Sequence, residues 1–320
     1  MLTYTLNRLF IAIPTIIGIT LVIFIAMRII PGDPLAIIEN QATGTSTVLT
    51  PEELVKVRDS LGLNDPYHVQ YFRWVGDVLK GDLGRSFWRD EPIRDTILRR
   101  APISMEIAVM AIALSWIIGV PLGVISATNR NTATDYISRG LTTFFLAVPA
   151  FWIGLVIVLF GVLWFSWRPP LSIVYPWDDL GRNLQMTVGP AGVLGIGLAA
   201  VMARLTRSAV LEALYQDYAR TARAKGLRER VVVWRHILRN ALLPVVTLSG
   251  LSLGGLLGGS VATERAFGFP GMGLALVQAL GERDWVMIQN LVLIYGVIYT
   301  VVNLLVDLSY AMLDPRIRYQ

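Results

Sequence analysis

Long apolar windows with almost no charge constrain this chain more than any other feature. Of its 320 residues, 54% are hydrophobic and only 16% are charged, whereas an average soluble domain carries about 25% charged residues. Apolar windows about 20 residues long are typical of transmembrane helices. We therefore expect an all-α membrane protein, for which the lipid bilayer is the main solvent.

The apolar windows predict six membrane spans. They lie at residues 9–30, 103–127, 141–167, 188–203, 244–262 and 285–308. No small-residue cleavage site follows the first window, so we expect it to be a retained helix and not a signal peptide. Pro121 and Pro149 fall inside predicted spans, where proline usually kinks a helix.

A polar stretch separates the first two spans. Pro31-Gly32-Asp33-Pro34 ends the first helix, and Thr50-Pro51-Glu52-Glu53 predicts a capped helix start. Another short helix is expected at 67–79. The sequence thus predicts an N-terminal helix (1–30), an extramembrane helical subdomain (31–102) and a five-helix core (103–320) with a long basic loop (204–243).

Basic residues are concentrated on one side of the predicted spans. The loop at 204–243 contains only the acids Glu212, Asp217 and Glu229. Its bases are Arg204, Arg207, Arg220, Arg223, Lys225, Arg228, Arg230, Arg235 and Arg239. The positive-inside rule therefore predicts that this loop and both termini are cytoplasmic.

The sequence contains no motif for catalysis or for a bound metal. It has no cysteine and only two histidines, His68 and His236, so a thiolate site is excluded and a histidine-rich metal site is not expected. It has no G-x-x-x-x-G-K-[ST] phosphate loop and no H-E-x-x-H. We expect that the chain is not an enzyme and that it holds no cofactor.

Glycine spacing predicts close helix packing in the fourth and fifth spans. The candidates are Gly192 and Gly195, then Gly250, Gly254 and Gly258. Small residues four apart let helix backbones approach closely in lipid. The sequence leaves open whether these glycines pack within the chain or against a second, similar subunit around a translocation path, and different faces could do both.

Two polar residues in the sixth span are candidates for a transport path. Asp307 lies near the inner end of that span, and Asn303 precedes it by one turn. An acid within the membrane is a functional candidate by default. The favoured interpretation is that Asp307 pairs with an arginine near the cytoplasmic interface.

The segment from Tyr218 to Gly226 predicts a short basic helix with a glycine stop. Its residues are Tyr218, Ala219, Arg220, Thr221, Ala222, Arg223, Ala224, Lys225 and Gly226. Bases near its C-terminus complement the helix dipole, and the alanines keep it slim. Such a helix suits an acidic-edged groove on a partner protein, but attraction to anionic lipid explains the composition equally well.

Several motifs occur in an order that is similar to a known family. The first group is Pro31-Gly32-Asp33-Pro34, then Gly81-Asp82-Leu83-Gly84 with Ser86, then Asp217-Tyr218 and Arg220-Thr221-Ala222-Arg223-Ala224-Lys225-Gly226. The second group is Arg239-Asn240-Ala241 with Pro244, Phe269-Pro270-Gly271-Met272-Gly273, and Asp314-Pro315-Arg316-Ile317-Arg318. Over essentially its whole length the chain resembles the permease subunits of binding-protein-dependent ABC importers, in the dipeptide, oligopeptide, nickel and glutathione branch.

The resemblance implies a type I importer permease fold in the bacterial inner membrane, with residues 31–102 periplasmic. It implies import of di- or oligopeptides or related small solutes. The implied partners are a homologous second permease, two cytoplasmic ATPases that bind ATP and magnesium, a periplasmic or lipid-anchored solute-binding protein and membrane lipid, but no nucleic acid. The alternatives are a secondary transporter or channel that needs no ATPase, for which mid-membrane charge pairs are expected, and a membrane scaffold.

Within this resemblance, the segment from Tyr218 to Gly226 corresponds to the coupling helix that sits in a cleft of the ATPase. Arg220-Thr221-Ala222 stands where the general pattern has Glu-Ala-Ala, and the segment that follows Gly226 is longer than in that pattern. The implied mechanism is alternating access, in which motion of this helix tilts the fourth and fifth spans.

Overall fold

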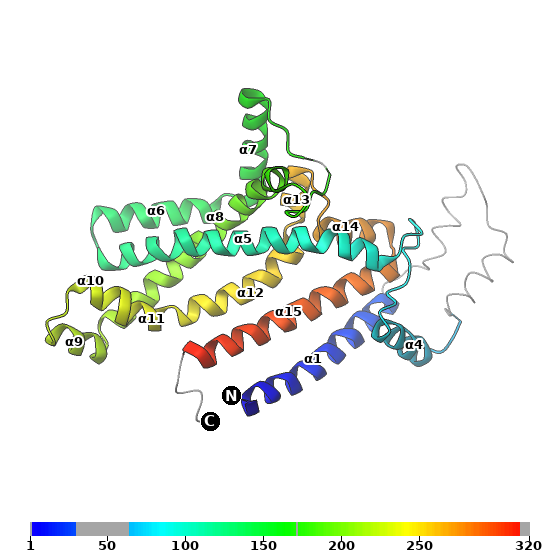
Figure 1. Cartoon of the computed structure of the whole chain (residues 1–320), viewed down its shortest axis with the longest axis horizontal. Helices are drawn as coiled ribbons and strands as arrows, with labels where there is room; N and C mark the ends of the chain where they lie inside the picture. Colours follow the sequence, from blue (N-terminus) through cyan, green and yellow to red (C-terminus); the bar gives the residue numbers. More distant parts are fainter. Residues whose placement is uncertain (1, 30–63, 171, 314–320) are drawn as a thin grey trace. The chain divides into compact units, whose positions relative to one another are not determined.

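The computed structural model describes residues 2–29, 64–170 and 172–313, and every regular element in these ranges is a helix. The elements are α1 (Leu2–Ile29), α4 (Tyr67–Leu79), α5 (Ile93–Thr128), α6 (Ala133–Ala147), α7 (Ala150–Phe165), α8 (Leu180–Leu214), α9 (Asp217–Ala224), α10 (Glu229–Val231), the π-helix η1 (Val232–Ile237), α11 (Leu238–Ala241), α12 (Leu243–Gly259), α13 (Val261–Phe267), α14 (Met272–Glu282) and α15 (Trp285–Leu313) (Figure 1). The all-α prediction is confirmed. The motifs predicted at 31–34, 50–53 and 314–318 lie outside the described residues.

Four of the described helices are long and apolar enough to cross a membrane by themselves. They are residues 8–29 of α1, the whole of α5 and α8, and residues 285–308 of α15. Two bent pairs pass the same test: α6 with α7, bent by 89°, and residues 229–241 with 243–258, bent by 48°. Six spans result if each bent pair crosses once, as the sequence predicted.

The span predicted at 141–167, with Pro149 inside it, is a sharply bent pair of helices in the structure. The structure divides this segment into α6 and α7, and the break falls at Val148 and Pro149. Val148 is extended, with φ −86° and ψ 124°, because the ring of a following proline disfavours helical geometry. Pro149 also lacks the N–H that would continue the helix.

Other predicted boundaries were too narrow. Helix α4 matches its prediction, but α5 begins at Ile93 and α8 extends from Leu180 to Leu214. Asp179 starts α8 early, because its side chain accepts a hydrogen bond from the Arg182 N–H. The predicted loop between the fifth and sixth spans contains α13 and α14. Polar and glycine-rich segments were therefore predicted as loops although they form the ends of long helices or short helices of their own.

Contacts group the chain into two compact units. One comprises residues 1–12, 99–274 and 298–320, and the other comprises residues 13–98 and 275–297. The second unit contains the predicted Gly81-Asp82-Leu83-Gly84 motif. There Asn290 Nδ2 donates to the Leu83 carbonyl at 2.9 Å, and Asp284 accepts from Ser86 Oγ at 2.5 Å. The motif therefore holds its turn against the start of α15.

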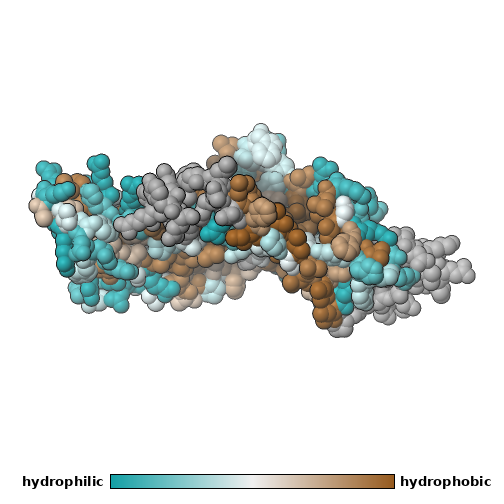
Figure 2. Space-filling model, turned by 90° about the horizontal axis from the view of Figure 1, so that it is seen from below, coloured by the Kyte–Doolittle hydropathy of each residue, from teal (hydrophilic) through white to brown (hydrophobic). Residues whose placement is uncertain are grey.

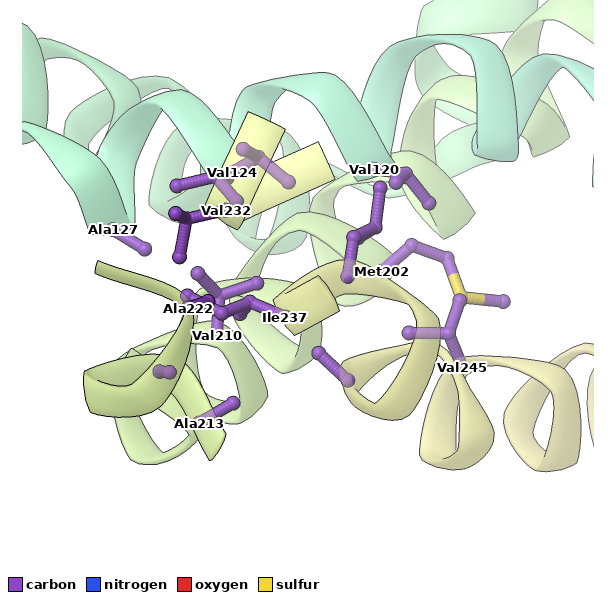
Figure 3. Packing of buried hydrophobic residues seen from close by; sticks show 14 residues of the cluster. Val120, Val124, Ala127, Met202, Val210, Ala213, Ala222, Val232, Ile237 and Val245 are labelled. Carbon is purple, nitrogen blue, oxygen red and sulfur yellow. The ribbon is translucent and has the colours of Figure 1, made fainter. Parts of the chain in front are cut away.

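The first unit has a hydrophobic core where α5, α8, α9, η1, α11 and α12 meet (Figure 3). Its fully buried members include Met202 and Val210 of α8 and Val232 of η1. The branched and small side chains of this core allow several short helices to pack against the long α8. The core places α9 next to the end of α8 (Figure 1).

Candidate coupling site

Helix α9 forms where the sequence predicted a short basic helix. It spans Asp217–Ala224, and Gln216 stands before it as the cap residue. The acid Asp217 is in its first turn and the base Arg223 in its last, an arrangement that the helix dipole favours. The prediction for residues 218–226 is confirmed as secondary structure, with a start one residue earlier.

One narrow face of α9 is buried and the remainder is exposed. Ala219 and Ala222 are 0% and 5% exposed and belong to the hydrophobic core that Figure 3 shows. Residues three apart lie on the same side of a helix, so these two alanines attach α9 to the core. The exposed residues are Tyr218, Arg220, Thr221, Arg223, Ala224, Lys225 and Gly226.

Arg223 ties α9 to the helices on both sides of it. Its Nε and Nη2 donate to the two carboxylate oxygens of Glu229 at 3.0 and 2.7 Å. Its Nη1 donates to the Leu214 carbonyl, at the end of α8, at 3.1 Å. The hydrogen bond with Glu229 raises the pKa of Arg223 above its ordinary value. Arg223 is therefore engaged within the chain, and the bases that face outward are Arg220 of α9 and Lys225, which directly follows the helix.

Gly226 ends this helix by its backbone conformation. Its φ is +73°, in the left-handed region, and the Gly226 N–H donates to the Arg223 carbonyl at 2.9 Å. A Cβ at this position would meet no atom within 4 Å. The glycine is thus required by its φ angle and not by a lack of space.

Beyond Gly226 the chain returns to the membrane through a π-helix. Residues Val232–Ile237 form η1, and α11 and α12 follow with a 48° bend. Short π-helical segments often lie at functional sites. Val232, Val233 and Ile237 are buried, so this segment is anchored in the same core as α9.

Hydrophilic residues gather over this end of the first unit. In Figure 2 hydrophilic residues cover the left end of the view, the end at which Figure 1 places α9 and α10. Besides Arg223, the chain segment 217–231 that contains α9 and α10 has the exposed bases Arg220, Lys225, Arg228 and Arg230. The site therefore offers an exposed basic face on a helix that is fixed from behind.

The predicted packing glycines divide into two groups. A Cβ at Gly195 would lie 3.0 Å from the Ala111 carbonyl oxygen of α5. Cβ atoms at Gly250 and Gly254 would lie 2.2 and 2.3 Å from side-chain atoms of Val306 and Tyr299 in α15. Gly192 and Gly258 have nothing within 4 Å. The first three glycines serve packing within the chain, and the other two face open space.

Asp307 has an arginine partner in the structure. Arg8 Nη1 lies 3.1 Å from Asp307 Oδ2, so the expected pairing of this acid with an arginine is present in the structure. Asn303 is half-buried one turn earlier. Neither residue lines a pocket of the described chain that suggests a path for solute.

Sequence reasoning missed two features of the first unit. Gly119 and Gly123 of α5 lie so close to α8 that a Cβ would approach the carbonyl oxygens of Ala199 and Ala203 to 2.6 and 2.5 Å. Their four-residue spacing could have identified them, because it is the same small-x-x-x-small pattern.

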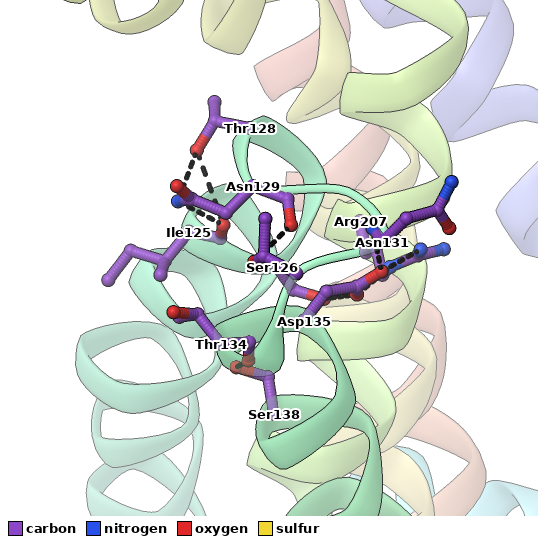
Figure 4. A network of polar contacts seen from close by, with 10 residues as sticks. Ile125, Ser126, Thr128, Asn129, Asn131, Thr134, Asp135, Ser138 and Arg207 are labelled. Carbon is purple, nitrogen blue, oxygen red and sulfur yellow. Dashed lines mark hydrogen bonds and ion pairs between the residues drawn. The ribbon is translucent and has the colours of Figure 1, made fainter.

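The second missed feature is a buried ion pair (Figure 4). Arg207 of α8 donates through Nε and Nη2 to the two oxygens of Asp135 of α6, both at 2.9 Å. Ser126 of α5 donates to the same carboxylate at 2.6 Å. Asp135 is fully buried. No local sequence signal joins Arg207 to Ser126 and Asp135, because Arg207 lies more than 70 residues further along the chain.

Within the part of the chain that the structure describes, no group of three or more His, Asp or Glu side chains could hold a metal ion. What the described site offers is an exposed helix face, supported by the ion pair between Arg223 and Glu229.

Comparison with known proteins identifies the class to which this fold belongs. Residues 119–319 match the family described as binding-protein-dependent transport system inner membrane component, and residues 1–108 match its N-terminal family. The chain belongs to this family and is a permease subunit of an ABC importer, a multi-pass protein of the inner membrane.

Two relatives match over the whole chain. The dipeptide transport system permease protein DppB of Alkalihalophilus pseudofirmus is 35% identical over 340 residues, which covers 100% of both chains. The oligopeptide transport system permease protein AppB of Bacillus subtilis is 35% identical over 322 residues, again with 100% of both chains covered.

A solved structure supports the type I importer permease fold. A chain of the MetNI methionine ABC transporter, in an inward-facing conformation, superposes with a TM-score of 0.56 at 20% identity. The match covers 70% of this chain and 99% of that chain. The fold class predicted from the resemblance is therefore confirmed.

Proposed function

We propose that this permease imports di- or oligopeptides, or related small solutes, and that α9 is the helix through which partner ATPases drive it. The single observation that carries the second part is the geometry of α9. Its alanine face is buried in the core of the first unit, and Arg220 and Lys225 are exposed on the rest of its surface.

This geometry suits a helix that transmits motion. A force on the exposed face of α9 passes into η1, α11 and α8 through the core around Ala219 and Ala222. Arg223 connects the same helix to the last carbonyl of α8 and to Glu229. A partner that moves α9 would therefore tilt α8 and the bent pair that ends in α12.

The division of labour follows from what the chain lacks and from its relatives. The sequence has no phosphate loop, so we assign ATP and magnesium binding, and hydrolysis, to two partner ATPases. A solute-binding protein delivers the solute. The peptide substrate class is inferred from the names of the relatives, which are dipeptide and oligopeptide permeases.

We infer that the second permease packs against the helix faces of α8 and α12 that carry Gly192 and Gly258. A Cβ built at Gly192 or Gly258 would meet no atom of another part of the described chain within 4 Å, and small residues at a helix surface favour close approach of another helix. A homologous permease packed there would complete the translocation path. The basic loop, the N-terminus and the C-terminus are assigned to the cytoplasm by the positive-inside rule.

A charge reversal on α9 tests the coupling role. Arg220→Glu should weaken co-purification of the ATPase subunits and lower solute uptake at least tenfold, because an exposed base would be replaced by an acid facing an acidic groove. Arg182→Glu is the matched control: Arg182 is also an exposed arginine, but it lies at the start of α8. Equal uptake by both variants, with ATPases bound, would refute the coupling role.

Two further measurements test the assignment of partners and sides. The purified chain without partners should hydrolyse no ATP, and turnover by it alone would contradict the proposed division of labour. A reporter fused after Gln320 should give a cytoplasmic signal. An external signal would overturn the topology but would leave the peptide permease assignment intact.

A further inference from the structure

The first unit contains a basic pocket that neither the coupling role nor the solute path requires. It has a volume of about 450 Å³ and lies among α5, α6 and α8. Its walls carry four arginines and several hydroxyl groups. The polar residues that matter here are Arg130, Arg139, Arg204, Arg207, Ser138 and Ser208.

The pocket has an excess of positive charge. Asp135 neutralises Arg207 through two hydrogen bonds (Figure 4), but it uses only Nε and Nη2 of that guanidinium. Among the described residues, no carboxylate forms an ion pair with Arg130, Arg139 or Arg204. Three uncompensated arginines that line one cavity create a site for a multiply charged anion.

The pocket is also partly built before any ligand arrives. Asp135 is fully buried and receives Ser126 Oγ as well as Arg207. These contacts fix one wall of the pocket, since they hold the Arg207 side chain in one orientation. A phosphate would find one guanidinium held in place together with the exposed side chains of Arg130, Arg139 and Arg204. Arginine recognises phosphate oxygens through paired hydrogen bonds.

The length of α8 indicates where this pocket lies along the membrane normal. Its 35 residues give a helix about 52 Å long, whereas the hydrocarbon layer is about 30 Å thick. Part of α8 must therefore extend beyond the hydrocarbon. Because Arg204 and Arg207 stand in its C-terminal third, this end fits the headgroup region.

Apolar side chains lie beside the basic walls. Leu122 of α5 and Leu211 of α8 line the pocket itself. A ligand with a phosphate at one end and hydrocarbon at the other matches this combination of walls.

We propose that this pocket binds a phosphate group, and that its source is the headgroup of an anionic phospholipid. Basic pockets between membrane helices on the cytoplasmic side are suited to anionic headgroups. The bound lipid would link α5, α6 and α8 at the end of α8 that leads to α9.

The test is a lipid titration of the full-length chain in detergent, followed by native mass spectrometry. Phosphatidylglycerol should bind saturably and phosphatidylcholine should not. In Arg139→Gln/Arg204→Gln, phosphatidylglycerol binding should be weaker by a factor on the order of thirty, since two bases near a phosphate are lost. The matched control is Arg230→Gln/Arg235→Gln, which removes two exposed arginines outside the pocket and should bind normally.

A second variant keeps every charge and fills the space. Ser208→Trp should block the pocket and weaken phosphatidylglycerol binding as much as the arginine variant does. Inorganic phosphate serves as the other probe. If phosphate alone saturates the site in the unvaried chain and both pocket variants abolish this, the phosphate site stands but its source is the free ion.

Three results would overturn the proposal. Equal loss in the pocket and control variants would mean that lipid is held by the general charge of the basic loop. No saturable binding of phosphatidylglycerol or phosphate would mean that the pocket takes no phosphate. Unchanged lipid binding with loss of a protein subunit in the pocket variants would assign the arginines to a protein partner.

Discussion

Two helix–turn corners of the first unit, one after α9 and one after α13, have a similar backbone. An exposed ion pair stabilises the first corner, and a buried carboxylate stabilises the second. Helix α9 is followed by Gly226 at φ +73°, and α13 is followed by Gly268 at φ +74°. At the α9 corner the ion pair between Arg223 and Glu229 is exposed, with side-chain exposures of 37% and 58%. At the α13 corner Glu264 is fully buried.

Glu264 organises the α13–α14 corner from inside. Its carboxylate accepts hydrogen bonds from Ser260 Oγ at 2.7 Å and from the Leu274 N–H at 2.6 Å. A third bond comes from the Gly273 N–H at 3.2 Å. The two N–H groups belong to the first turn of α14, where an anion is stabilised by the helix dipole.

The same carboxylate explains the glycines of the motif Phe269-Pro270-Gly271-Met272-Gly273. A Cβ at Gly271 would lie 2.5 Å from Glu264 Cδ, and one at Gly273 would lie 3.0 Å from Glu264 Oε1. The motif therefore leaves room for a buried acid that lies earlier in the chain.

The difference in burial separates a corner that can rearrange from one that cannot. An exposed ion pair contributes about 0–1 kcal/mol, so the contact between Arg223 and Glu229 can be exchanged for contacts with a partner at little cost. Removing one member of a buried polar cluster costs about 3 kcal/mol or more, because the others remain unsatisfied. We therefore expect motion at α9 and rigidity at the α13–α14 corner.

The largest expected effect follows from Glu264→Ala. This change leaves the Ser260 hydroxyl and two N–H groups of α14 without their acceptor, so the free energy of unfolding should fall by about 3 kcal/mol. Denaturant unfolding in detergent measures it. The control Glu282→Ala removes an acid whose side chain is 38% exposed and should cost less than about 1 kcal/mol. If Glu264→Ala lowers the free energy of unfolding less than Glu282→Ala does, the α13–α14 corner is not more rigid than the α9 corner.

The next largest effect is expected from Gly226→Ala. A residue with a Cβ at positive φ costs about 1–2 kcal/mol, so the end of α9 should shift, with a several-fold loss of solute uptake and normal membrane insertion. Gly76→Ala is the control, because Gly76 also has no atom within 4 Å of a built Cβ but lies within α4 without a positive φ. Normal uptake in Gly226→Ala would show that the position of this turn is unimportant.

A smaller effect is expected when the exposed pair at α9 is broken. Arg223→Gln and Glu229→Gln should each lower the free energy of unfolding by about 0.5–1 kcal/mol. The double variant should lose little more than either single one, because the two side chains share one interaction. Measured coupling above about 2 kcal/mol would mean that the α9 corner is as rigid as the other one.

The smallest expected effect is a pH dependence of the free energy of unfolding that the titration of Glu264 causes. Burial raises the pKa of Glu264 above its ordinary value of 4.5, although hydrogen bonds from Ser260, Leu274 and Gly273 oppose this. The folded state then binds the proton more tightly than the unfolded chain does. The stabilisation is complete below about 4.5 and is lost as the pH rises through the raised pKa.

Glu264→Gln provides the comparison for this slope, because a glutamine does not titrate. As the pH rises above about 4.5, the free energy of unfolding of the unvaried chain should fall relative to that of this variant. If the free energy of unfolding of the unvaried chain instead rises relative to that of Glu264→Gln over the same pH range, the pKa of Glu264 is lowered in the folded state.

The sequence predicted those parts of the site whose structure depends on residues close together in the chain. Tyr218–Gly226 could be recognised because alanines, bases and a terminal glycine act on the same short helix. The partners of Arg223 and Asp135 could not, because they depend on how α8 and its neighbours pack. The break at Pro149 was missed even though proline gives a local signal, since prolines inside membrane helices often only kink them.

The sequence by itself predicted the six apolar segments, the concentration of bases in the loop at 204–243 and the short basic helix at 218–226, because hydropathy, charge and helix ends depend on neighbouring residues. Only the tertiary structure decided that Gly195, Gly250 and Gly254 pack inside the chain while Gly192 and Gly258 do not. It also decided that Glu264 is buried. Burial and close approach depend on residues far apart in the chain, which no local pattern records.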